Sequence, residues 1–96
     1  MNTQSLFYPG DDRGLLYLFQ PQYKWVEIFA TNVTDVKVAD KLIHKFSGLN
    51  SNYIVNFDLE DCDRILRIEC RKMPVNIAMV IQLVKASGFN AEWLED

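Results

Sequence analysis

The sequence predicts an α+β sandwich, in which two helices cover one face of a four-stranded antiparallel sheet. Over residues 25–94 the spacing of apolar residues changes in the order strand, helix, strand, strand, helix, strand. The predicted strands alternate apolar and polar side chains, as half-buried antiparallel strands do, whereas the helical segments repeat apolar residues every three or four positions. Only a short acidic turn separates the second strand from the third, which favours a hairpin between them.

The first strand is predicted over residues 25–30, because this segment is rich in β-branched and aromatic residues. Alternate residues of a strand point to opposite faces of its sheet. We therefore expect one set to face the core and the other to face away from it, namely Val26, Ile28 and Ala30 inward and Trp25, Glu27 and Phe29 outward.

The first helix is predicted from about Asp35 to Phe46. Thr34 or Asn32 can accept a hydrogen bond from a free backbone amide and so cap this helix, and the carboxylate of Asp35 favours its positive end. Gly48 then supplies a left-handed stop. The apolar face of the helix consists of Ala39, Leu42, Ile43 and Phe46.

The remaining elements are a hairpin, a second helix and a short last strand over residues 89–93. Pro74 interrupts the strand pattern, Asn76 is a good helix cap, and Gly88 ends the second helix. Apolar residues alternate on both sides of the acidic turn, namely Tyr53, Val55, Phe57 and Leu59 before it and Leu66, Ile68 and Cys70 after it. The apolar face of the second helix consists of Ile77, Val80, Ile81 and Val84.

This order of elements matches a ferredoxin-like βαββαβ sandwich formed by residues 22–96. Right-handed crossovers place the first and third strands in the centre of such a sheet. Residues 1–21 form an N-terminal extension, which a turn at Pro21 separates from the domain. Its apolar run over residues 15–19 is expected to be buried, either as an extra strand on this domain or against another chain.

The composition excludes several classes of partner. The chain has 96 residues, the length of one domain, and its 13 acidic and 10 basic side chains give a net charge of −3. Nucleic acid is not an expected partner, because its binding needs a basic surface. We find neither a secretory signal nor an apolar stretch long enough for a bilayer, so we expect a cytoplasmic protein without a membrane partner. Cys62 and Cys70 lie outside the close spacing of zinc and redox motifs, which indicates free thiols.

Fold-marking residues between Trp25 and Leu94 give the chain a resemblance to a known family. They are Thr31 at the end of the first strand, Ala39 and Leu42 on the first helix, Gly48 and Leu49 after it, and the segments 57–60 and 85–92. On these residues the chain resembles the heavy-metal-associated domain of copper chaperones and metal-transporting ATPases. The segment 56–69 is similar to that of short bacterial relatives that lack the metal cysteines. The resemblance implies a ferredoxin-like scaffold.

The resemblance does not extend to the metal site. The metal-binding members of the family hold copper with the two cysteines of a Met-Thr-Cys-x-x-Cys loop after the first strand. In this sequence Ala30 and Thr31 stand in place of Met-Thr, and Asn32 and Asp35 stand at the two cysteine positions. An amide and a carboxylate are hard ligands, whereas Cu(I) favours thiolates and thioethers. We therefore expect neither a metal site nor a cofactor.

No other group of residues indicates catalysis. His44 is the only histidine, and its position near the end of the first helix is typical of a surface residue that complements the helix dipole. Cys70 is expected in the core and Cys62 in the acidic turn. The carboxylates of this turn lack the glycine and distal glutamate of a calcium loop and are expected to be solvated; they belong to Asp58, Glu60, Asp61 and Asp63. The sequence therefore predicts a non-enzymatic protein.

An apolar patch on the outer face of the sheet is expected from the predicted strands. It would contain Trp25, Phe29, Ile54 and Ile65. Such a surface is typically an interface, unless residues 1–21 fold over it. We therefore expect a module for protein interaction or self-association.

Two other functions stay open. The family resemblance allows a metal-ion carrier with unorthodox ligands, drawn from His44, Cys62, Cys70 and Met73. The other is a small-molecule sensor of the kind that some ferredoxin-like domains form at dimer interfaces, although no residue of this sequence favours it.

Overall fold

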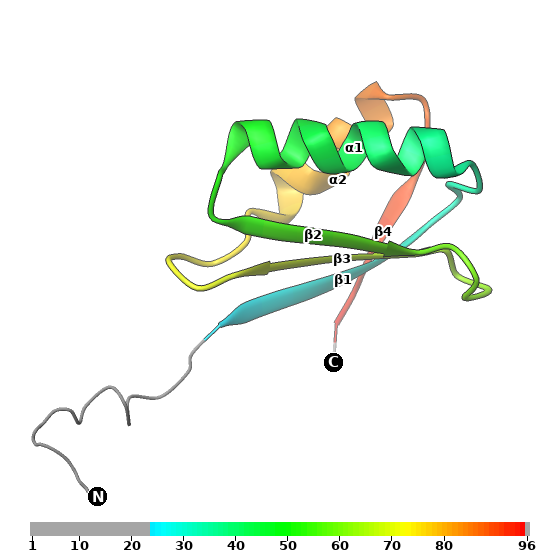
Figure 1. Cartoon of the computed structure of the whole chain (residues 1–96). Helices are drawn as coiled ribbons and strands as arrows, with labels where there is room; N and C mark the ends of the chain where they lie inside the picture. Colours follow the sequence, from blue (N-terminus) through cyan, green and yellow to red (C-terminus); the bar gives the residue numbers. More distant parts are fainter. Residues whose placement is uncertain (1–23, 96) are drawn as a thin grey trace, which may run out of the picture.

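The computed structural model describes residues 24–95 of the chain. The predicted extension over residues 1–21 lies outside the described residues. The order of elements is strand, helix, strand, strand, helix, strand, as the sequence predicts. These elements are β1 (Trp25–Thr31), α1 (Val36–Leu49), β2 (Tyr53–Asp58), β3 (Ile65–Cys70), α2 (Ile77–Ala86) and β4 (Ala91–Leu94) (Figure 1).

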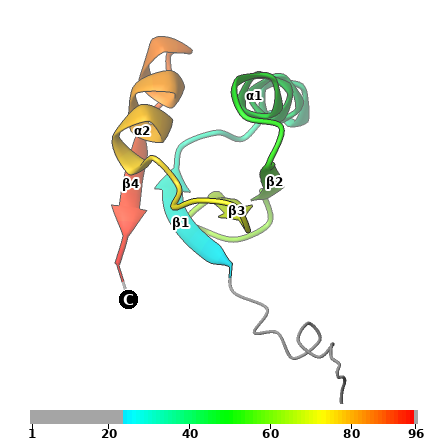
Figure 2. The same cartoon turned by 90° about the vertical axis from the view of Figure 1, so that its left-hand side faces the viewer.

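The four strands form one antiparallel sheet in the order β2-β3-β1-β4. β1 and β3 therefore occupy the centre, as predicted, and β2 and β4 are the edges. Both helices lie on the same side of the sheet, with α1 over β2 and α2 beside β4 (Figures 1 and 2). This confirms an α+β fold with a four-stranded antiparallel sheet and two helices, an arrangement consistent with the ferredoxin-like prediction.

The helix ends differ in part from the prediction. Asp35 itself caps α1, because its Oδ1 accepts a hydrogen bond from the Lys37 amide at 2.8 Å, so the expected cap at Thr34 or Asn32 is wrong. Gly48 does not stop α1, which continues to Leu49. In α2 the predictions are confirmed: Asn76 Oδ1 accepts from the Met79 amide at 3.0 Å. Gly88 then adopts a φ of 92°, which a glycine tolerates without a steric penalty.

The hydrophobic core lies between the sheet and the two helices. Helix α1 contributes three of its four predicted apolar residues as fully covered side chains, whereas Ile43 is only half-buried. The largest side chains with almost no exposure are Phe29, Val33, Leu42, Phe46, Leu66, Ile68, Cys70, Val80 and Val84. The predicted burial of Cys70 is thus confirmed.

The predicted facing of β1 is wrong. Residues directly opposite each other in an antiparallel pair project from the same face of the sheet. Phe29 is paired with Leu66, and Glu27 with Ile68, and both of these β3 residues are fully buried beneath the helices. Phe29 is itself 0% exposed. The set that contains Phe29 therefore faces the helices, and the set that contains Ile28 faces away from them.

The reversed facing of β1 has a physical explanation in Glu27. A charged residue next to apolar neighbours indicates an outward position, because burial of an unpaired carboxylate is costly. In the structure Trp93 Nε1 donates a hydrogen bond to Glu27 Oε1 at 2.8 Å, and Glu27 is only half-buried. This partner on β4, 66 residues away in the chain, compensates the carboxylate on the helix side of the sheet.

Candidate functional site

The β1–α1 loop is held by hydrogen bonds from the residues that the family resemblance places at the metal positions. Asn32 Oδ1 accepts a hydrogen bond from the Asn90 amide at 2.8 Å and so links this loop to the start of β4. Asp35 caps α1. Both side chains therefore have structural roles, and neither is an orphaned polar group that indicates a bound ligand.

Thr31 connects the same loop to the β2–β3 turn. Its Oγ1 donates to the Arg64 carbonyl oxygen at 2.6 Å and accepts from the Val33 amide at 3.2 Å. Its backbone amide donates to the Asp63 carbonyl oxygen at 2.9 Å. Arg64 has a φ of 46°, in the left-handed region, and its guanidinium donates to the Leu59 carbonyl oxygen. These hydrogen bonds therefore connect the β1–α1 loop to the β2–β3 turn.

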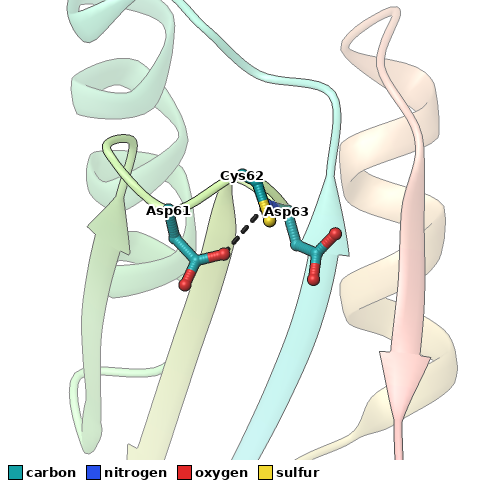
Figure 3. Close-up of side chains that lie close together, drawn as sticks. All are labelled: Asp61, Cys62 and Asp63. Carbon is teal, nitrogen blue, oxygen red and sulfur yellow. Dashed lines mark hydrogen bonds between the residues drawn. The ribbon is translucent and has the colours of Figure 1, made fainter.

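The acidic β2–β3 turn brings three adjacent potential metal ligands together. The ligand atoms of Asp61, Cys62 and Asp63 lie within 4.8 Å of one another (Figure 3). However, Asp61 Oδ1 accepts from the Asp63 amide at 2.9 Å, the bond drawn in Figure 3, and so serves the turn itself. The Asp58 carboxylate likewise accepts from the amides of Glu60 and Asp61. All three ligands come from one turn, and hydrogen bonds within a turn explain their proximity without a metal.

The residues considered for an unorthodox metal site do not converge. Cys62 lies in the β2–β3 turn, whereas Met73 follows β3 at the opposite end of the sheet (Figure 1). Cys70 is completely buried. His44 is exposed on α1, where its Nδ1 lies 2.8 Å from the Asp40 carbonyl oxygen. Among the His, Cys, Asp and Glu side chains of residues 24–95, only one group brings three ligand atoms within 4.8 Å of one another. It consists of Asp61, Cys62 and Asp63.

No described element covers the sheet face opposite the helices (Figure 2). We call it the open face. The register places Ile54 and Ile65 on it, together with the β1 residues that were predicted to face the core. Phe29 lies on the other face, and so does Trp25, which is paired with Cys70. The aliphatic side chains of the open face are Val26, Ile28, Ile54, Ile65 and Leu94.

Two aliphatic side chains of the open face have high exposure. Ile54 on the edge strand β2 is 50% exposed, and Leu94 on the other edge strand is 36% exposed. Val26, Ile28 and Ile65 lie on the central strands between them and are half-buried by their neighbours. Each strand thus contributes at least one aliphatic residue to the face, and Glu69 and Arg67 of β3 stand between Ile54 and the aliphatic residues of β1.

Charged residues divide the open face into two ends. At the β1 N-terminal end, Glu69 is only 8% exposed and its Oε1 lies 3.3 Å from Arg67 Nη1 and 3.8 Å from Lys24 Nζ. Two cations around one carboxylate leave this end with a net positive charge. At the opposite end, the register places the exposed carboxylates of Asp58 and Glu92 beside Ile65 and Ala30. The face is thus basic at one end and acidic at the other.

A groove between α1 and β2 was not predicted from the sequence. It has a volume of about 530 Å³ and lies outside the core, along the edge of the sheet. Val36, at the start of α1, is 72% exposed and lines this groove. Val36 is an apolar residue that does not belong to the buried face of α1. This is the one sequence signal that could have indicated the groove.

Comparison of the chain with family models, curated proteins and solved structures finds no match. In the described part of the chain, no helix has both the length and the apolar character needed to cross a membrane.

Proposed function

We propose that the chain is a non-enzymatic module with a ferredoxin-like fold that self-associates through its open face. The observation that carries the proposal is the set of aliphatic side chains that all four strands place on this face, of which Ile54 is 50% exposed. Exposed apolar surface that extends over several strands is typical of protein interfaces. Its burial in a dimer contributes roughly 25 cal/mol for each Å² removed from water.

The charge distribution favours a second copy of the chain as the partner. In a two-fold dimer both copies use the same surface, and when the axis runs across the strands each end of that surface meets the opposite end of its partner. The end with Lys24 and Arg67 would then face the end with Asp58 and Glu92. Opposite charges at both ends of one interface stabilise this orientation and disfavour the parallel one.

The strand order and the family resemblance support the scaffold part of the proposal. A sheet order of β2-β3-β1-β4 with a helix after β1 and after β3 is what two right-handed crossovers produce. The likeness to heavy-metal-associated domains agrees with this scaffold, and the hydrogen bonds of Asn32 and Asp35 support a role without metal. We extend the proposal to a cytoplasmic protein whose partner is protein rather than nucleic acid.

Sedimentation equilibrium of the full chain tests the proposal. We expect a reversible monomer–dimer equilibrium with a dissociation constant of about 1 to 100 µM, since an interface of this polarity is moderate in strength. Higher salt should weaken the dimer, because the paired charges lie at the rim of the interface. A strict monomer up to about 1 mM, with Ile54 shielded by its own chain, would contradict the proposal.

A further inference from the structure

The outer edge of β2 offers backbone hydrogen-bonding groups to a further strand. β2 pairs with β3 on one side, and within residues 24–95 no strand pairs with its other side. The Tyr53 amide donates to the Asn50 carbonyl oxygen at 3.0 Å, outside the ladder with β3. Backbone groups of successive residues point alternately to the two edges of a strand. The amides of Val55 and Phe57, two and four residues further on, therefore point to the unpaired edge.

The groove beside this edge combines an apolar floor with an acidic rim. α1 lies over β2 (Figure 1), and the groove between them is lined on the sheet side by residues 56–60, at the C-terminal end of β2 and just after it. Asp40, Asp58 and Glu60 line it, and none of the described residues that line it is basic. Asp40 and Glu60 are exposed, so their charges reach the surface of the groove. The apolar side chains of the floor are Val36, Ala39, Ile43, Phe57 and Leu59.

We propose that this groove binds an extended peptide of another protein, in which apolar residues alternate with lysine or arginine. The peptide adds to β2 as a fifth strand: its backbone pairs with Val55 and Phe57, and its apolar side chains enter the groove below α1. Strand addition to a free edge obtains affinity from backbone hydrogen bonds and specificity from alternate side chains. The basic residues at the remaining positions project from the opposite face of the sheet, where Asp58 lies, and the charges of Asp40 and Glu60 add a general attraction for a basic peptide.

The acidic rim also argues against the two other occupants of this edge. Parallel pairing of β2 with β2 of a second copy would bring two sets of Asp40, Asp58 and Glu60 together, and repulsion disfavours such edge-to-edge contact. The chain's own apolar run over residues 15–19 contains no basic side chain that would pair with the rim. The proposal concerns a surface distinct from the open face and does not depend on self-association.

Titration of the full chain with a nine-residue peptide of alternating valine and lysine, followed by NMR, tests the inference. We expect a dissociation constant of about 10 to 100 µM at low salt, with the largest shifts at the amides of Val55 and Phe57. A peptide of alternating valine and glutamate should bind at least tenfold more weakly. Methylation of the valine amides in one peptide and of the lysine amides in another blocks opposite edges of the added strand. Only one of these two peptides should lose binding.

Neutral variants of the rim separate the groove from general charge effects. The double variant Asp40→Asn with Glu60→Gln should weaken the binding of the valine–lysine peptide about tenfold. Asp58 is left unchanged because its carboxylate accepts two hydrogen bonds from the turn. The matched control is Glu95→Gln with Asp96→Asn, which changes the net charge equally after β4 and should alter binding less than twofold. The rim variant should still self-associate like the original chain, so failure of one proposal is distinguishable from failure of the other.

Three results would overturn the inference. The first is equal binding of both methylated peptides, which would indicate charge attraction without strand addition. The second is absence of binding of the valine–lysine peptide at millimolar concentration. The third is strong protection of the Val55 and Phe57 amides from hydrogen exchange in the free monomeric chain, which would show that the chain itself already covers this edge.

Discussion

Replacement of Phe29 by alanine is expected to lower the free energy of unfolding by about 3 to 5 kcal/mol. The side chain is 0% exposed and lies on the central strand β1, opposite Leu66, so its removal leaves a cavity that the surrounding core cannot readily fill. Urea denaturation followed by circular dichroism measures the change. Phe29→Leu keeps most of the side-chain volume and should lower the free energy of unfolding by only about 1 kcal/mol. This variant replaces Phe29→Ala in the test if the alanine variant does not fold.

Ile28→Ala is the matched control for the facing of β1. Ile28 is adjacent in sequence but lies on the open face, where it is half-buried. The measurement is made at a concentration at which the chain is monomeric. Replacement of Ile28 by alanine should then lower the free energy of unfolding by about 1 kcal/mol, well below the loss for Phe29→Ala. A larger loss for Ile28→Ala than for Phe29→Ala would contradict the assignment of the two faces.

Ile54→Lys is expected to weaken self-association about thirtyfold. Ile54 is 50% exposed in the monomer, and loss of its burial in the dimer corresponds to about 2 kcal/mol of binding free energy. The variant should retain the stability of the monomer, because lysine is well tolerated on an exposed edge strand. Sedimentation equilibrium of both proteins gives the ratio of dissociation constants.

Leu49→Lys provides the control for this change. Leu49 is 58% exposed at the end of α1, away from the open face, and a lysine there also complements the helix dipole. Its dimer should be as strong as that of the original chain. If Leu49→Lys weakens the dimer as much as Ile54→Lys does, the interface does not lie on the open face.

The elements could be predicted from the sequence because their signals are local. The alternation from Tyr53 to Cys70 gives a hairpin, and Asn76 and Gly88 mark the ends of α2 by their own backbone and side-chain chemistry. The cap of α1 was missed by one residue or more, because Asn32, Thr34 and Asp35 are all suitable caps. The structure assigns the role to Asp35 and uses Asn32 to hold Asn90, a contact over 58 residues that local reasoning cannot supply.

The site was harder to predict because it depends on which face of each strand is covered. β1 carries bulky apolar residues on both faces. Alternation therefore divides its residues into two sets but does not show which set faces the helices. The decisive facts are the pairing of Phe29 with Leu66 and the hydrogen bond from Trp93 to Glu27, both between distant segments. The groove was missed for a similar reason: α1 and β2 each look ordinary, and only their packing forms it.

The interface is tested most directly by intermolecular NOEs in a mixed sample of isotope-labelled and unlabelled full chains. Our proposal predicts contacts from the methyl groups of Ile28, Ile54 and Leu94 in one copy to the open face of the other. Contacts of these methyl groups to residues 1–21 of the same chain alone, or intermolecular contacts confined to the helices, would contradict self-association through the open face.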